Sequence, residues 1–168
     1  MGHRHFMHKE IYEQRTIIQD MTSRFVGKNK ILPNIFGHNT DKFLENIEHI
    51  HFVACGTSYH ASLVAKDWIE QFTKITCTAE VASEYKYKKI NVLPKTLFVS
   101  ISQSGETADT ISSLKKALKL SYTNTLAICN VAESTLTRLS GMNFLMNAGP
   151  EIGVASTKAF TSQLFTLL

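Results

Sequence analysis

The stretch TLFVSISQSGETADTISSLKKALKL, residues 96–120, decides the fold. Its first six residues, 96–101, are almost unbrokenly apolar and rich in β-forming types, which is typical of a strand buried on both faces. In residues 106–120 apolar side chains recur every three or four positions, which predicts an amphipathic helix. The positions expected to face inward are Ile111, Leu114 and Leu118. A buried strand that leads through a short loop into such a helix is typical of a parallel sheet.

The same alternation of strand and helix runs along most of the chain. Apolar, β-rich runs predict strands at 50–55, 76–81, 96–101, 124–129 and 143–146. Helical patterns cover 57–72, a short segment through Tyr87, 106–120 and 157–168. Strands that are apolar on both faces and alternate with helices predict an α/β fold, a doubly wound five-stranded parallel sheet flanked by helices, as in flavodoxin-like proteins.

Residues 1–45 differ from the rest and predict an N-terminal helical arm or connector, followed by a domain at 46–168. A helix is expected at 7–25. Its apolar face would consist of Ile11, Ile17 or Ile18, Met21 and Phe25. A lone helix has to bury such a face against the main body or a partner chain. Because the last helix ends on Thr-Leu-Leu with no stop signal, we expect the natural chain to continue past Leu168.

Composition narrows the class of protein. Hydrophobic residues make up 43% of the 168 residues and charged residues 19%, which supplies a core and disfavours disorder. The net charge of +4 is spread along the chain, which argues against nucleic acid as the main ligand. The longest apolar runs fall far below the roughly 18 residues that cross a bilayer, so no membrane partner is expected. Three widely spaced cysteines indicate a reducing compartment, the cytoplasm, and provide no pair of zinc ligands.

Two turns rich in glycine and hydroxyl residues follow strands of the predicted sheet. Cys55-Gly56-Thr57-Ser58 ends the first strand, and Ser102-Gln103-Ser104-Gly105-Glu106-Thr107 ends the third. Both turns lie at the carboxyl edge of the sheet, where ligands of doubly wound folds bind. Gly56 and Gly105 allow close approach of the backbone, and helix N-termini attract anions. The hydroxyl groups that can donate to phosphate oxygens belong to Ser58, Ser102, Ser104 and Thr107.

Helix capping is the structural alternative, because a Ser or Thr before a helix is usually an N-cap. That alternative stays open for Thr57 and Ser58 taken alone. The second turn contains three hydroxyls and an amide within six residues, more than one cap requires. Neither turn is a Walker A loop or a G-x-G-x-x-G motif, and neither contains a lysine, which disfavours a nucleoside triphosphate. The predicted ligand is a single phosphoryl group on a small molecule.

A third glycine-bearing stretch, residues 149–158, follows the last strand and leads into the final helix. Its carbonyls and Ser156 could orient the hydroxyls of a polyol; the alternative is a plain loop in which Ser156 or Thr157 caps the helix. Lys158 is expected at the surface or in a salt bridge. Acid–base candidates are few, and Glu106 is explained by the helix dipole. The sequence therefore predicts a site that binds, and it assigns no catalytic residue and no metal ligand.

Five motifs together resemble one family. They are KEIYEQ (9–14), CGTS (55–58), SQSGETADT (102–110), LAICN (126–130) and EIGVASTKAF (151–160). The chain is similar in these to the isomerase part of the glucosamine-6-phosphate synthase family, the glutamine–fructose-6-phosphate aminotransferases (isomerising). It departs from the family at Arg15, where proline is common. The resemblance implies the first of two sugar isomerase (SIS) subdomains together with the preceding connector.

The resemblance also implies site residues and partners. The implied phosphate ligands are Ser58, Ser102, Gln103, Ser104 and Thr107, and the implied sugar ligands are Thr57, Val154 and Ser156. The family's catalytic groups come from a second SIS subdomain or a partner subunit, which implies that this chain binds fructose 6-phosphate without turnover. A glutaminase domain and a homodimer are further implied, and no cofactor is. The alternatives are a standalone phosphosugar sensor and a complete small phosphosugar isomerase, although no base for the latter can be identified.

Overall fold

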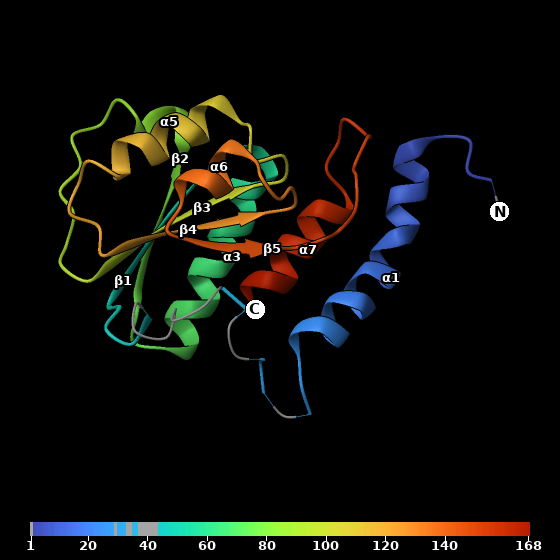
Figure 1. Cartoon of the computed structure of the whole chain (residues 1–168), viewed down its shortest axis with the longest axis horizontal. Coiled ribbons are helices and arrows are strands. Elements are labelled where there is room, and N and C mark those ends of the chain that lie inside the picture. Colours follow the sequence, from blue (N-terminus) through green and yellow to red (C-terminus); the bar gives the residue numbers. More distant parts are fainter. Residues whose placement is uncertain (1, 29, 33–34, 37–43) are drawn as a thin grey trace.

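Strand β3 (Thr96–Ser102) forms the centre of a parallel sheet, and all seven of its residues are buried. The computed structural model describes residues 2–28, 30–32, 35–36 and 44–168. The strands of this part are β1 (His49–Ala54), β2 (Thr76–Val81), β3, β4 (Asn124–Cys129) and β5 (Met142–Leu145). They pair in the order β2-β1-β3-β4-β5, all in parallel (Figure 1). The five-stranded, doubly wound sheet that the sequence predicts is thus confirmed.

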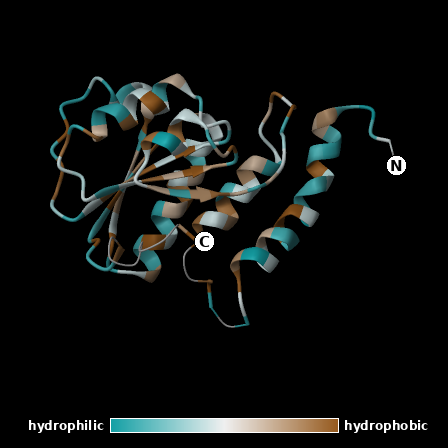
Figure 2. Cartoon of the chain, in the orientation of Figure 1, coloured by the Kyte–Doolittle hydropathy of each residue, from teal (hydrophilic) through white to brown (hydrophobic). Residues whose placement is uncertain are grey.

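Helices cover both faces of this sheet. Their bounds are α1 (Phe6–Phe25), α3 (Gly56–Phe72), α4 (Ala82–Tyr85), α5 (Ala108–Ala117), α6 (Thr135–Leu139) and α7 (Lys158–Leu167). Figure 1 shows α5 and α6 over one face and α3 and α7 over the other. Successive residues of one strand therefore belong to two different apolar clusters, one on each face of the sheet. Phe52 packs with Ala65 of α3, whereas Val53 packs with Leu114 of α5 and Leu136 of α6. This two-sided burial explains why the central strands carry apolar residues on both faces, as the hydrophobic colours in the sheet show (Figure 2).

Helix α5 is shorter than its periodicity predicts. Thr107 has extended backbone angles (φ −64°, ψ 113°), so the helix begins at Ala108, and Leu118 forms its C-cap. Leu118, at the C-terminal end of this helix, is 50% exposed instead of facing inward. Leu114 is buried as expected, and Ala117 takes the next inward position. The short helix α6, capped by the Ser134 side chain, had no clear signal in the sequence.

Helix α1 packs along α7 at one side of the domain (Figure 1). Met21 is buried in the core and Phe25 lies against Phe144 of β5, with ring centroids 4.8 Å apart. The prediction that Ile11 belongs to the buried face is wrong, because Ile11 is 42% exposed while the neighbouring Glu10 is only 3% exposed. A carboxylate therefore occupies the inward position at this end of the helix. The predicted boundary at residue 45 adjoins residues 37–43, which lie outside the described residues, and it stays a prediction.

A chain of buried polar groups crosses the layer of α4 and α5. The Tyr85 and Tyr122 hydroxyls lie 3.0 Å apart, and the Tyr122 hydroxyl lies 2.8 Å from Nδ1 of His51 on β1. Nε2 of His51 lies 3.5 Å from a carboxylate oxygen of Glu80, which is beyond a well-formed hydrogen bond. Burial lowers the pKa of His51, with Glu80 acting in the opposite direction. The fold thus favours the neutral imidazole.

Candidate functional site

The first two predicted loops meet at the carboxyl edge of the sheet. β1 and β3 are adjacent and in register, with Ala54 opposite Ile101. Residues 55–58 and 103–107 follow these two positions, so both loops leave the sheet side by side and open helices α3 and α5. The strand order changes direction at β1 and β3, which is where doubly wound folds bind their ligands.

The first loop turns sharply at Gly56, which has a φ of +55° and no described atom within 4 Å of the position of a Cβ. Thr57 is exposed, and Ser58 is buried one residue further into α3. The Ser58 hydroxyl oxygen accepts a hydrogen bond from Nε2 of Gln163 on α7, at 2.9 Å. Because the oxygen accepts, its own proton stays available for donation. Gln163, 1% exposed, is a supporting residue that the sequence reasoning missed; its only signal was a long amide within an apolar helix.

The second loop is closed by its own hydroxyl groups. Ser102 Oγ accepts a hydrogen bond from the Gly105 amide at 3.1 Å and lies 3.0 Å from Oγ1 of Thr107. Ser104 Oγ accepts from the Glu106 amide at 3.1 Å. Gly105 has a φ of +69°, which permits the sharp turn. These bonds bring Ser102, Ser104 and Thr107 into one compact loop.

Neither helix that starts at these loops has a side-chain cap among the residues that the structure describes. Cys55 and Thr107 occupy the N-cap positions of α3 and α5, and the side chain of neither accepts a bond from the first turn. The capping alternative for these hydroxyls therefore does not hold: Ser58 lies inside α3, and Thr107 bonds to Ser102. Two uncapped helix N-termini, each with a partial positive charge, point to the same edge of the sheet.

Glu106 has a structural task. Its carboxylate accepts a hydrogen bond from the Thr135 amide at the start of α6, at 2.7 Å. This backbone bond lowers the pKa of Glu106. The exposed carboxylate is therefore held ionised at a helix N-terminus, which suits anchoring α6 rather than giving up or taking a proton.

Hydrogen bonds with Asn130 and Glu151 fix both ends of the third stretch, residues 149–158. Asn130, which follows β4, donates to the Gly149 carbonyl at 2.7 Å and accepts from the Ala148 amide at 2.6 Å. Further on, the Glu151 carboxylate accepts from the amides of Thr157 at 2.8 Å and Ala159 at 3.2 Å. Glu151 thus caps α7, in place of Ser156 or Thr157, which the sequence favours for this role. Between these points Val154 is fully exposed and Ser156 is half-buried.

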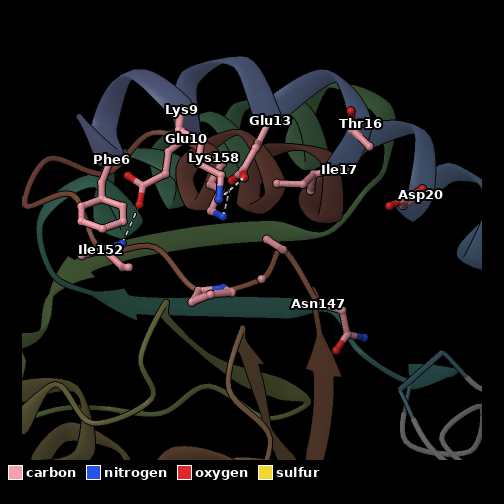
Figure 3. Close-up of a pocket in the computed structure, with 13 residues that line it drawn as sticks. Phe6, Lys9, Glu10, Glu13, Thr16, Ile17, Asp20, Asn147, Ile152 and Lys158 are labelled. Carbon is pink, nitrogen blue, oxygen red and sulfur yellow. Dashed lines mark hydrogen bonds and ion pairs between the residues drawn. The ribbon is translucent and has the colours of Figure 1, made fainter. Parts of the chain in front are cut away.

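A groove of about 410 Å³ lies between α1 and residues 147–158. Figure 3 shows Lys9, Glu10 and Glu13 of α1 facing Ile152 and Lys158 across it. None of the residues that were predicted to hold phosphate or sugar lines this groove. It is therefore distinct from the edge formed by the first two loops. Within the described residues, no group of three or more His, Cys, Asp or Glu is placed to hold a metal ion, and no helix is both long and apolar enough to cross a membrane.

Comparison with known proteins supports one relationship. The SIS domain family matches residues 43–168. The chain is 51% identical over 166 residues to the glutamine–fructose-6-phosphate aminotransferase (isomerising) of Pseudomonas aeruginosa, covering 99% of this chain and 27% of that protein. It thus spans about a quarter of the length of the curated relatives it matches.

Solved structures of proteins with related names are also similar to this chain. The C-terminal domain of glucosamine-fructose-6-phosphate aminotransferase from Francisella tularensis is 48% identical, with a TM-score of 0.95 over 99% of this chain and 46% of that one. Glucosamine-6-phosphate deaminase from Thermotoga maritima is 25% identical, with a TM-score of 0.75 over 97% of this chain and 48% of that one.

Proposed function

The chain belongs to the SIS domain family, and we propose that it is the phosphosugar-binding half of the isomerase part of a glutamine–fructose-6-phosphate aminotransferase. The proposed substrate is fructose 6-phosphate, and the product of the whole enzyme is glucosamine 6-phosphate. The proposal extends to this chain the activity for which the relatives are named. The observation that carries it is the pair of uncapped helix N-termini at the adjacent carboxyl ends of β1 and β3.

The phosphate is proposed to bind between the first two loops. First-turn amides of α3 and α5 would donate to its oxygens, and the helix dipoles favour its negative charge. The proposed side-chain ligands are Ser58, Ser102, Gln103, Ser104 and Thr107. The sharp turns at Gly56 and Gly105 let the backbone come close. Hydroxyls and amides suit a monophosphate ester that has to be released again, because they bind it without a full opposite charge.

The sugar is proposed to lie between Thr57 on one side and Val154 and Ser156 on the other. Thr57 and Val154 are exposed, which leaves their groups accessible to a ligand. In the whole enzyme, ammonia would condense with the C2 ketone of the open-chain sugar to form an imine, with loss of the carbonyl oxygen as water, and a proton shift from C1 to C2 would give the amino aldose. This half would supply binding energy and orientation, which accelerate the reaction only when the reacting groups are supplied elsewhere.

The proposed partners follow from this division of labour. A second SIS subdomain would supply the acid–base groups, and a glutaminase domain would supply ammonia. A homodimer is proposed as well, since α1 carries the exposed apolar side chains of Phe6, Ile11 and Tyr12. The proposed compartment is the cytoplasm, in keeping with the three free thiols.

Isothermal titration calorimetry of this chain with fructose 6-phosphate tests the proposal, with inorganic phosphate and fructose as controls. We expect saturable binding that requires both the phosphate and the sugar. Thr107→Val should weaken it because the hydroxyl partner of Ser102 is lost, whereas the exposed Ser121→Ala should not. Equal affinity for fructose 6-phosphate and inorganic phosphate would contradict a phosphosugar site. Glucosamine 6-phosphate formation by the chain alone would contradict binding without turnover.

A further inference from the structure

A buried carboxylate on α1 is hydrogen-bonded to the backbone of the third glycine-bearing stretch, residues 149–158. Glu10, 3% exposed, accepts a hydrogen bond from the Ile152 amide at 2.6 Å (Figure 3). It also accepts from the Gly153 amide, at 3.1 and 3.2 Å. A buried carboxylate is costly unless it is hydrogen-bonded, and charged acceptors make the stronger bonds. A Cβ at Gly153 would lie 2.6 Å from Oε2 of Glu10, so the close approach depends on glycine.

The next polar residues on the same face of α1 hold the other end of this loop. Glu13 lies 2.7 Å from Nζ of Lys158, which is only 4% exposed, and this bond lowers the pKa of Glu13. Gln14 accepts a hydrogen bond from the Thr161 hydroxyl. Positions 10, 13 and 14 are three and four residues apart, which puts them on one face of the helix. The polar residues Glu10, Glu13 and Gln14 of the motif KEIYEQ therefore bind both ends of the segment 152–161.

Residues 154–156 lie between these two anchors. Val154 is fully exposed and Ser156 is half-buried. Because Glu10 holds the two residues before Val154, it sets the direction in which the backbone leaves toward Ser156. The apolar contacts of α1 with the core lie further along the helix, at Ile17, Ile18, Met21 and Phe25, so the core packing of α1 does not depend on Glu10 alone.

We propose that Glu10 is a positioning residue for sugar recognition, which fixes the conformation of residues 154–156 from outside the binding edge. The inference rests on the proposed function, in which these residues meet the sugar. It goes beyond that function because it makes α1, outside the matched SIS region, part of the sugar site. Loss of the Glu10 carboxylate should weaken the interaction with the sugar and leave the phosphate loops, on the other side of the site, unaffected.

The test compares Glu10→Gln with Asp20→Asn, which makes the same change of carboxylate to amide on the same helix at an exposed residue lining the same groove. Calorimetry measures binding of fructose 6-phosphate and, separately, of inorganic phosphate to the 168-residue chain. We expect Glu10→Gln to weaken fructose 6-phosphate binding about tenfold, since a charged acceptor is lost, with phosphate affinity unchanged. Asp20→Asn should leave both affinities unchanged. Amide NMR shifts of Ile152 and Gly153 should move in Glu10→Gln only.

Each other outcome has one meaning. If Glu10→Gln binds fructose 6-phosphate as tightly as the wild type, the inference is wrong. If it weakens fructose 6-phosphate and inorganic phosphate equally, Glu10 has a general structural role and the inference is also wrong. A wild-type chain that binds fructose 6-phosphate no better than phosphate overturns the proposed function, and the inference with it. In that case a cooperative thermal unfolding transition of the wild-type chain would show that the protein is folded and that the missing binding is not due to misfolding.

Discussion

Replacing Gly105 by alanine should destabilise the chain far more than the same change at Gly56. Both glycines open proposed phosphate loops, and both have a positive φ, +69° and +55°. Their surroundings differ. A Cβ at position 105 would lie 2.1 Å from Oγ and 2.5 Å from Cβ of Ser134, and 2.8 Å from Sγ of Cys129. The same atom at position 56 would meet no described atom within 4 Å.

These distances give the expected size of the effect. An L-residue in the left-handed region costs about 1–2 kcal/mol, and both variants bear this cost. At Gly105, overpacking adds about 1–3 kcal/mol. Ser134 also caps α6 by accepting from the Thr137 amide, and displacing it costs about 1 kcal/mol more. We therefore expect Gly105→Ala to be about 2–4 kcal/mol less stable than Gly56→Ala, a large part of the stability of an ordinary domain.

Urea unfolding followed by circular dichroism measures both variants against the wild type. Adding Ser134→Gly to Gly105→Ala removes the nearest side chain and should recover part of the loss. Equal destabilisation by the two alanines would refute the argument, because it would show that the left-handed conformation alone sets the cost. A double variant no more stable than Gly105→Ala would refute the assignment of the clash to Ser134.

Three further predictions concern charge and reactivity. Because burial lowers the pKa of His51 below its ordinary 6.5, the unfolded chain binds more protons as the pH falls. The free energy of unfolding should be fully retained above about pH 6.5 and should decrease as the pH falls below that value. His51→Gln should flatten this pH dependence in urea titrations. An unchanged pH dependence in the variant would contradict the prediction. Burial raises the pKa of the Cys77 thiol to about 11, so iodoacetamide should modify the half-buried Cys55 first, and fructose 6-phosphate should slow that reaction in peptide mass spectrometry. Modification of Cys77 ahead of Cys55 would contradict the first point, and an unchanged rate at Cys55 in the presence of fructose 6-phosphate would contradict the second. Glu13→Ala leaves the Lys158 ammonium buried without its partner and should lower the free energy of unfolding, measured in urea, by about 1.5–3 kcal/mol. Adding Lys158→Met should recover part of this loss. If it recovers none, the buried charge is not the cause.

Patterns of short range predicted the fold and the loops of the candidate site. The TLFVSI strand is apolar on both faces, which only a sheet covered on both sides explains. The glycines at 56 and 105 marked sharp turns because few other residues adopt a positive φ, and both turns occur. The errors came at helix ends, as with Leu118, because periodicity does not say at which turn a helix stops.

The sequence by itself therefore determined the α/β class, the strand and helix alternation and the position of the two glycine-bearing turns, since each depends on residues close together in the chain. Only the tertiary structure decided which distant polar side chains contact the loops of the candidate site. Glu10 meets the Ile152 amide across 142 positions of sequence, and Gln163 meets Ser58 across 105. A polar residue on a helix has the same local pattern whether it faces water or a buried amide. Its burial and its partner depend on how distant segments pack, and that packing is what sets the energy of the bond.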